Sequence, residues 1–188
     1  ESAIDKIKGI SLQALATNTE VVEAIVPRLE SFGLASTGDQ TFGVMVVGID
    51  PEREQVFTGL ADRLYEGAYL KPGDDGALLA SGVADRLKLG VGDTVLLISQ
   101  GYHGVNAAGK YPVRGLIDFP SPELDKQLLY LSLPTAQYFY GATGMVTTVA
   151  LQIRNADALP RLKRTLSAEL DTTYYAWHDW TEMMPELL

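Results

Sequence analysis

The chain has 188 residues, of which 46% are hydrophobic and 21% charged, which suits one large globular domain or two small lobes and argues against disorder. Its net charge of −9, without a basic stripe, excludes a nucleic-acid partner, since phosphate binding needs clustered Lys and Arg. The absence of cysteine excludes disulfides, thiolate catalysis and zinc–thiolate sites.

The ends of the sequence carry no targeting or membrane signal. No apolar run approaches the ~20 residues that a membrane helix needs. The chain starts at Glu1 rather than Met and has no signal peptide. We therefore expect it to be a domain excised from a longer or processed protein.

The N-terminal third begins with a predicted helix and continues with predicted strands. Apolar residues at helical spacing over 3–16 predict the helix. We expect two short strands, 20–26 and 28–35, bent at Pro27, because proline inside a helix removes a hydrogen bond and β-branched pairs favour strands. The 3.6-residue period of the apolar residues around Pro27 leaves a helix open as the alternative.

The middle of the chain predicts short strands separated by turns. A turn is expected at 36–39, and the apolar run 42–49 predicts a strand buried on both faces, ended by Asp50-Pro51-Glu52. Ser81 is the expected cap of a short helix that Gly90 stops. The remaining predicted elements are a loop over 67–76, strands over 77–80, 94–99, 111–117 and 128–133, and helical segments over 81–87 and 134–140.

The C-terminal segment predicts a longer strand and two helices. Residues 145–153 alternate between apolar and polar, as in a strand with two different faces. Leucines at helical spacing predict a helix over about 157–170. A short strand follows over 172–177, and Asp179 with Glu182 predicts a capping box for a last helix.

The distribution of these elements predicts an α+β fold with two lobes. The middle, 56–142, contains many short strands, whereas the flanks contain the longer helices and strands. We therefore expect a β-rich lobe inserted into an α/β lobe that residues 1–55 and 143–188 build together, with strands 42–49 and 145–153 in one sheet.

No catalytic set is visible in the sequence. Gly90-Val91-Gly92-Asp93 follows a helix and precedes a strand, the reverse of a phosphate loop, so we interpret it as a turn. His103 and His178 lack metal-site spacing, and the carboxylate clusters Asp74-Asp75 and Asp50/Glu52/Glu54 suit solvated loops. We predict no catalytic residue, no metal, no cofactor and no chemistry at either histidine.

One connection stands out as a candidate contact site. Residues 100–110 join two apolar strands by about 11 residues, longer than an ordinary hairpin loop. Long loops between strands are often binding loops, and Tyr102, His103 and Val105 give this one an amphipathic tip suited to protein contact. A merely structural extension of the hairpin is the alternative.

The order of several short motifs resembles the extracytoplasmic domain of ABC transporter permeases of the MacB/LolC/LolE (FtsX-like) family. The motifs, none specific alone, are Pro27-Arg28, Val46-Val47-Gly48-Ile49-Asp50-Pro51-Glu52, Leu64-Tyr65-Glu66-Gly67, Leu79-Ala80-Ser81-Gly82-Val83-Ala84-Asp85-Arg86-Leu87, Leu89-Gly90-Val91-Gly92-Asp93-Thr94-Val95 and Val113-Arg114-Gly115-Leu116. Family members usually begin this domain with a strand directly after the first membrane helix; because residues 1–16 look helical, that strand is expected to be either cut away or disguised.

The resemblance implies a non-enzymatic periplasmic domain of an inner-membrane protein, with a porter-like α/β lobe and an inserted β-rich lobe. It implies three kinds of partner: a cytoplasmic ATPase subunit, a second permease copy or paralogue, and a periplasmic chaperone or adaptor. The family's functions are lipoprotein release, efflux and force transmission to cell-wall enzymes; the 101–109 loop favours lipoprotein release. The alternatives are a secreted or periplasmic binding module and an enzyme with an unrecognised site.

The same family geometry predicts both termini on one side, near a membrane. Two tryptophans and two methionines near the C-terminus suit a membrane-proximal segment, because Trp favours the interface. Packing of these residues on the domain's own core is the equal alternative. They are Trp177, Trp180, Met183 and Met184.

Overall fold

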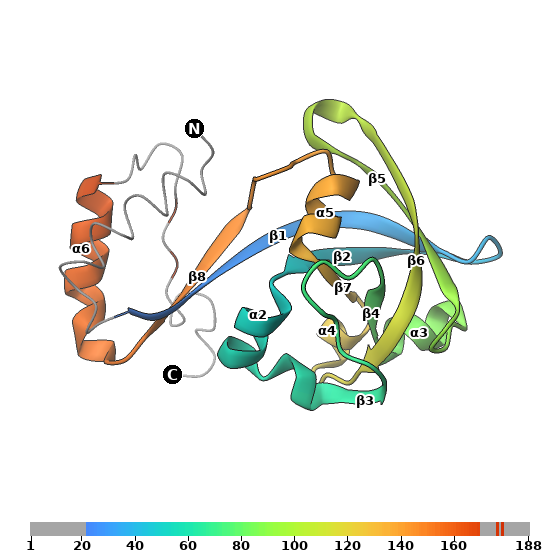
Figure 1. The fold of residues 1–188 in the computed structure, drawn as a ribbon, viewed down its shortest axis with the longest axis horizontal. Helices are drawn as coiled ribbons and strands as arrows, with labels where there is room; N and C mark the ends of the chain where they lie inside the picture. The colour runs from blue at the N-terminus through green and yellow to red at the C-terminus, as the bar shows by residue number, and fades with distance from the viewer. Residues whose placement is uncertain (1–21, 170–175, 177, 179–188) are drawn as a thin grey trace. The chain divides into compact units, whose positions relative to one another are not determined.

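The computed structural model describes residues 22–169, 176 and 178 (Figure 1). Residues 24–151 form one unit, and the described residues from 152 onward belong to a second. The strands are β1 (Val22–Ser36), β2 (Thr41–Ile49), β3 (Leu64–Gly67), β4 (Ala77–Ala80), β5 (Thr94–Gln100), β6 (Asn106–Ile117), β7 (Leu128–Ser132) and β8 (Thr148–Ile153). The α-helices are α2 (Pro51–Thr58), α3 (Ser81–Leu87), α4 (Pro122–Asp125), α5 (Leu133–Phe139) and α6 (Leu159–Glu169).

Hydrogen bonding joins six strands into a closed ring. β1 pairs antiparallel with both β2 and β5, and β5 pairs antiparallel with β6. β6 pairs parallel with β4, β4 antiparallel with β7, and β7 parallel with β2, which returns the ring to β1. β3 and β8 lie outside the ring, on β6 and β1 respectively. This mixed sheet with short helices confirms the predicted α+β class.

The core consists of two apolar clusters that meet at β4. All four residues of β4 are buried; Leu79 belongs to the first cluster and its neighbour Leu78 to the second. Successive strand residues point to opposite faces, so β4 separates the two clusters. α5 adds Ala136 and Phe139 to the first cluster, which places this helix against the ring.

β1 differs from the predicted pair of bent strands, and the helix alternative was wrong. It is one strand of 15 residues that continues through Pro27. Its ladder with β2 begins only at Arg28, opposite Ile49. Pro27 therefore lies just before that ladder, where its missing N–H removes no hydrogen bond to β2.

β2 ends where predicted, but the sequence analysis missed the helix that follows. The Asp50 side chain accepts hydrogen bonds from the backbone N–H groups of Glu52 and Arg53, both at 3.2 Å, and Pro51 occupies the first turn of α2. An N-cap aspartate followed by proline is a helix-start signal, so Asp50-Pro51 both ends the strand and begins a helix.

α3 has the predicted bounds, but both predicted end signals were wrong. Ser81 is its first helical residue, and its hydroxyl donates to the carboxylate of Asp125 at 2.9 Å. Asp125, at the end of α4, also accepts from the Gly82 N–H at 2.8 Å and so caps α3 from a distant part of the chain. The helix ends on Lys88, whose φ of 56° is left-handed, before Gly90 is reached.

The C-terminal elements are shorter than predicted. β8 begins at Thr148 instead of 145, and its six residues are all half-buried, so the expected contrast between its faces is absent. β8 and β2 both pair with β1, which confirms that they share a sheet. In α6, Leu162 and Leu166 are buried along the predicted stripe.

Several predictions fall outside the described residues. They concern the helix over 3–16, the strand over 172–177, the capping box, the terminal Trp and Met residues, and the position of both termini. The two-lobe division, with bounds at 55 and 142, also stays a prediction; the contacts set different bounds and group residues 24–55 with the middle of the chain. None of the described helices is long and apolar enough to cross a membrane.

Candidate functional site

The candidate contact site is a hairpin whose connection is much shorter than predicted. β5 and β6 stay paired out to Gln100 opposite Asn106, so the connection is Gly101–Val105 rather than 100–110. The glycine- and alanine-rich run after Asn106, which looked like loop, continues the strand because it has a full set of ladder partners on β5. We call Gly101–Val105 the hairpin tip.

The three predicted contact residues all lie on the hairpin tip and are exposed. Tyr102 is 47% and Val105 60% exposed, and His103 is exposed beside Tyr102, with ring centroids 4.0 Å apart. His103 has a φ of 56°, a left-handed conformation that is uncommon for a residue with a side chain. The tip therefore presents an aromatic and an aliphatic group to solvent, as an amphipathic contact requires.

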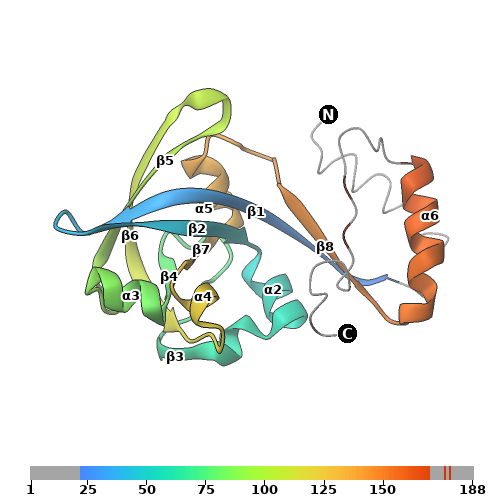
Figure 2. The ribbon, with the colours of Figure 1, turned by 180° about the vertical axis from the view of Figure 1, so that it is seen from behind.

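Backbone hydrogen bonds fix the hairpin tip. The Gly101 N–H donates to the Val105 carbonyl at 2.6 Å, and the Gly104 N–H donates to the Gly101 carbonyl at 3.0 Å. The Tyr102 N–H donates to the Tyr140 carbonyl at 2.7 Å, which holds the tip against the end of α5. Both ribbon views show α5 beside this hairpin (Figures 1 and 2). The tip is therefore held on a rigid element instead of projecting freely.

Further apolar side chains are exposed on nearby strands and on α5. Leu34 on β1 lies directly opposite Ile98 on β5, and both are exposed, so they share the outer face of the sheet. Phe32, two residues from Leu34 on the same strand, is 69% exposed, and Tyr138 on α5 is 85% exposed. The sequence analysis missed these residues, although the Phe32-x-Leu34 spacing is that of one strand face.

Two carboxylates of the predicted clusters, Glu54 and Asp74, are paired within the fold instead of being solvated. Glu54 is 2% exposed and forms a two-point pair with Arg28, at 2.9 Å and 2.6 Å. Asp74 and Asp75 both accept from Arg114, at 2.9 Å and 2.6 Å. Glu54 and Asp74 therefore have partners within the fold, whereas the side chain of Asp75 is 83% exposed.

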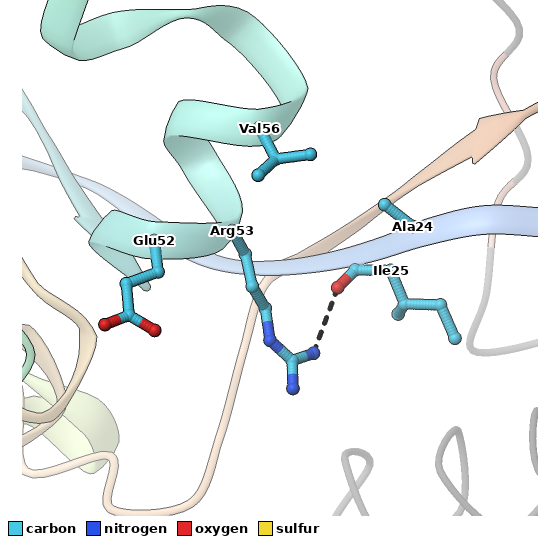
Figure 3. A pocket seen from close by; sticks show the side chains of 5 residues that line it. All are labelled: Ala24, Ile25, Glu52, Arg53 and Val56. Atoms are coloured by element: carbon cyan, nitrogen blue, oxygen red, sulfur yellow. Dashed lines mark hydrogen bonds between the residues drawn. The ribbon is translucent and has the colours of Figure 1, made fainter.

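A shallow hollow lies beside α2. Its lining residues Ala24, Ile25, Glu52, Arg53 and Val56 are shown in Figure 3. The Arg53 guanidinium donates to the Ile25 carbonyl at 3.1 Å, so its charge supports the backbone of β1. Among the described residues, no group of three His, Asp or Glu side chains is placed to hold a metal ion.

The Gly90–Asp93 segment has the geometry of the predicted turn. The Gly90 N–H donates to the Asp93 carboxylate at 2.8 Å, and the Gly92 N–H donates to the Val113 carbonyl at 2.9 Å. These two N–H groups, which a phosphate loop would aim at its ligand, are thus paired within the protein.

Comparison with known proteins identifies the family. Residues 3–169 match the family described as MacB-like periplasmic core domain. Two curated relatives are lipoprotein-releasing system transmembrane proteins LolC from Xylella fastidiosa, strains 9a5c and Temecula1, 31% and 30% identical over 89% of this chain. The chain spans only 42% of the length of these relatives.

Solved structures share the fold at low sequence identity. The extracellular domain of the noncanonic ABC-type transporter YknZ from Gram-positive bacteria has a TM-score of 0.60 at 16% identity, covering 86% of this chain and 76% of that one. The periplasmic region of MacB from Actinobacillus actinomycetemcomitans has the same TM-score and identity, with 89% and 74% covered. With the family match over most of its length, this chain belongs to the MacB-like periplasmic core domains, the extracytoplasmic domains of ABC transporter permeases.

Proposed function

We propose that this domain couples cytoplasmic ATP hydrolysis to the movement of cargo outside the membrane, through conformational change and contact with partners. In this proposal the ATPase is a separate subunit that acts through the membrane helices of the parent protein, beside a second permease copy or paralogue. The chemistry lies in that ATPase, and this domain transmits movement. Structural use of Glu54, Asp74 and Asp75 supports a role without catalysis.

Within the family, we propose that the cargo is a lipoprotein and that the hairpin tip contacts a periplasmic chaperone or adaptor. The relatives at about 30% identity are named as parts of a lipoprotein-releasing system. The observation that carries the proposal is the tip itself, where Tyr102 and Val105 are exposed on a rigidly held turn. A preorganised aromatic group binds at low entropic cost, since less freedom is lost on contact.

Removal of the hairpin tip in the full permease tests this function. Gly101–Val105 is replaced by Asn-Gly, which closes a two-residue hairpin between the paired Gln100 and Asn106. The expected result is a folded permease with unchanged ATP turnover that no longer releases lipoprotein or retains its periplasmic partner in a pull-down. The matched control shortens the exposed turn between β1 and β2, residues 37–40, in the same way.

Comparison of the two shortened permeases distinguishes a partner-binding role of the hairpin tip from a purely structural one. Equal release and equal partner retention by both shortened permeases would make the tip a structural extension and remove the support for lipoprotein release. Loss of both activities in the control as well would indicate that hairpin length, rather than the tip, is what matters.

A further inference from the structure

We infer that Tyr140 couples the position of the hairpin tip to strand β1, so that displacement of the tip is transmitted into the ring of strands. Tyr140 directly follows α5 and is 3% exposed. Its role is positioning, because it does not itself reach the exposed contact surface. The functional meaning of this coupling rests on the proposed function, but its physical content can be measured without any partner.

On the tip side, the link is a backbone contact that requires glycine. The Tyr102 N–H donates to the Tyr140 carbonyl at 2.7 Å. A Cβ added to Gly101 would lie 2.6 Å from the same carbonyl oxygen, too close for any real side chain. Gly101 has an ordinary extended backbone, with φ −80°, so glycine is needed here for close approach and not for conformation.

On the strand side, the link is the tyrosine hydroxyl. Tyr140 Oη lies 3.3 Å from the carbonyl oxygens of both Ser31 and Phe32 on β1, and donates its proton between them. Ser99 Oγ on β5 donates to the same Phe32 carbonyl at 2.6 Å. The end of α5 is thereby joined to the point where β1 and β5 come together.

The ring of Tyr140 transmits displacement between the hairpin tip and β1 because it is tightly packed. Its centroid lies 4.7 Å from that of Phe139 in an edge-to-face arrangement. Burial raises the pKa of its hydroxyl, so the group stays a neutral donor at all physiological pH values. A close-packed interior has no space in which one end of this side chain can move while the other stays fixed. The tip and β1 therefore shift together.

Hydrogen exchange in the isolated chain tests the coupling with a matched tyrosine pair. Tyr140→Phe removes the bonds to β1 and keeps the ring, while Tyr138→Phe removes an exposed hydroxyl from the same helix. For Tyr140→Phe we expect about twofold to tenfold faster exchange both at the Tyr102 amide and over Phe32–Leu34. Tyr138→Phe should change neither. Acceleration at only one of the two places, or equal acceleration in both variants, overturns the inference.

A second variant perturbs the same link from the tip side. Gly101→Ala forces the tip off Tyr140, and Gly43→Ala is its control, since no atom lies within 4 Å of the added Cβ there. Coupling is reciprocal, so Gly101→Ala should also accelerate exchange over Phe32–Leu34. Combined with Tyr140→Phe, its effect should be less than additive. Additive effects, or unchanged exchange over Phe32–Leu34, would show that tip and strand are independent.

These measurements fail separately from the proposed function. Hydrogen exchange reports the link through Tyr140 in the absence of any partner. Deletion of the hairpin tip reports whether a partner binds there. A permease that releases lipoprotein without its tip would refute the proposed function and leave the coupling through Tyr140 intact. If release depends on the tip but the hydrogen-exchange rates of the tip and β1 change independently, the coupling is refuted and the proposed function stands.

Discussion

Two regions of the first unit use their polar groups in different ways. The capped region, made of α2, α3, α4 and the loop 71–76, contains Glu54, Asp74 and Asp125, each bonded to a partner far away in the sequence. The hairpin region, made of β5, β6 and α5, contains no Asp or Glu at all. Its Arg114 pairs with Asp74 of the capped region, while its outer end is held by backbone hydrogen bonds and aromatic packing.

The causes of the raised pKa differ in the same way between two buried tyrosines, Tyr130 and Tyr111. Beside Glu54 of the capped region, burial raises the pKa of Tyr130 on β7, and the charge of Glu54 raises it further. In the hairpin region, burial raises the pKa of Tyr111, with contributions only from Tyr138 and Tyr140. The hairpin tip contains no Asp, Glu, Lys or Arg, and interface centres are likewise depleted of charged residues. The comparison teaches that carboxylates join distant segments in the capped region, whereas the hairpin tip leaves the side chains of Tyr102 and Val105 exposed.

The buried ion pair offers the largest expected effect. Glu54→Ala should lower the free energy of unfolding by about 3 kcal/mol, because it removes the two-point partner of the Arg28 guanidinium and leaves only the longer contact with Glu30, at 3.8 Å. Urea unfolding measures the loss, with the exposed Glu52→Ala on the same helix as the control. Equal losses in both variants would mean that the ion pair with Arg28 contributes no more to stability than an exposed glutamate of α2.

Removal of the distant cap of α3 should have the next largest effect. Asp125→Ala removes acceptors for Ser81 Oγ and the Gly82 N–H, and should cost about 2 kcal/mol of unfolding free energy. Asp85→Ala, an exposed carboxylate within α3, should change stability little. An unchanged urea midpoint for Asp125→Ala would show that solvent caps the helix equally well.

Acid should weaken the capped region through Asp74. Burial acts to raise the pKa of Asp74, but the hydrogen bonds from Arg114 and the Gly76 N–H outweigh it and lower the pKa below its ordinary 3.8. A lowered folded pKa gives stability that is present above the ordinary value and lost as pH falls below it. Asp74→Asn should therefore cost about 1 kcal/mol near neutral pH.

The pH dependence distinguishes this contribution from packing. Urea unfolding at a series of pH values should show that the difference between the natural chain and Asp74→Asn shrinks below pH 3.8. Asp39→Asn, in the exposed turn between β1 and β2, is the control and should show no such trend. If the difference in unfolding free energy between the two chains does not change with pH, it arises from packing and not from the charge of Asp74.

The hairpin tip should show the smallest effect on stability. Tyr102→Ser combined with Val105→Ser should change the free energy of unfolding by less than about 0.5 kcal/mol, since both side chains are exposed. Partner retention should fall about tenfold or more, because aromatic anchors contribute most of a contact's energy. A large loss of stability would contradict the division between the two regions.

The sequence predicted those elements whose signals are local. The β4 strand, the bounds of α3, the position of α5 to within one residue and the leucine stripe of α6 follow from short apolar patterns, and the motif order identified the family. All three predicted contact residues indeed lie together on one turn, because they are neighbours in sequence. Whether they contact a partner stays a prediction.

What the sequence did not predict depends on distant residues. The cap of α3 is Asp125, 44 positions from Ser81, and no local pattern links them. The apparent loop after Asn106 is strand because β5 supplies its ladder, and Tyr140 holds the tip through a contact between separate elements. Tertiary pairing of this kind overrides local propensity, which is why Gly109 and Ala108 form part of a strand.

The parallel ladder between β2 and β7 has a consequence for how the chain is made. During synthesis Met45 emerges long before its partner Leu128, so β2 cannot form its ladder with β7 until most of the domain has been made. Until β7 arrives, β2 has an open edge beside apolar residues such as Val44 and Val46, which is the kind of surface that recruits wrong partners. The ring of strands therefore closes only through a contact between residues far apart in the chain, and such non-local pairing is a feature of slowly folding domains.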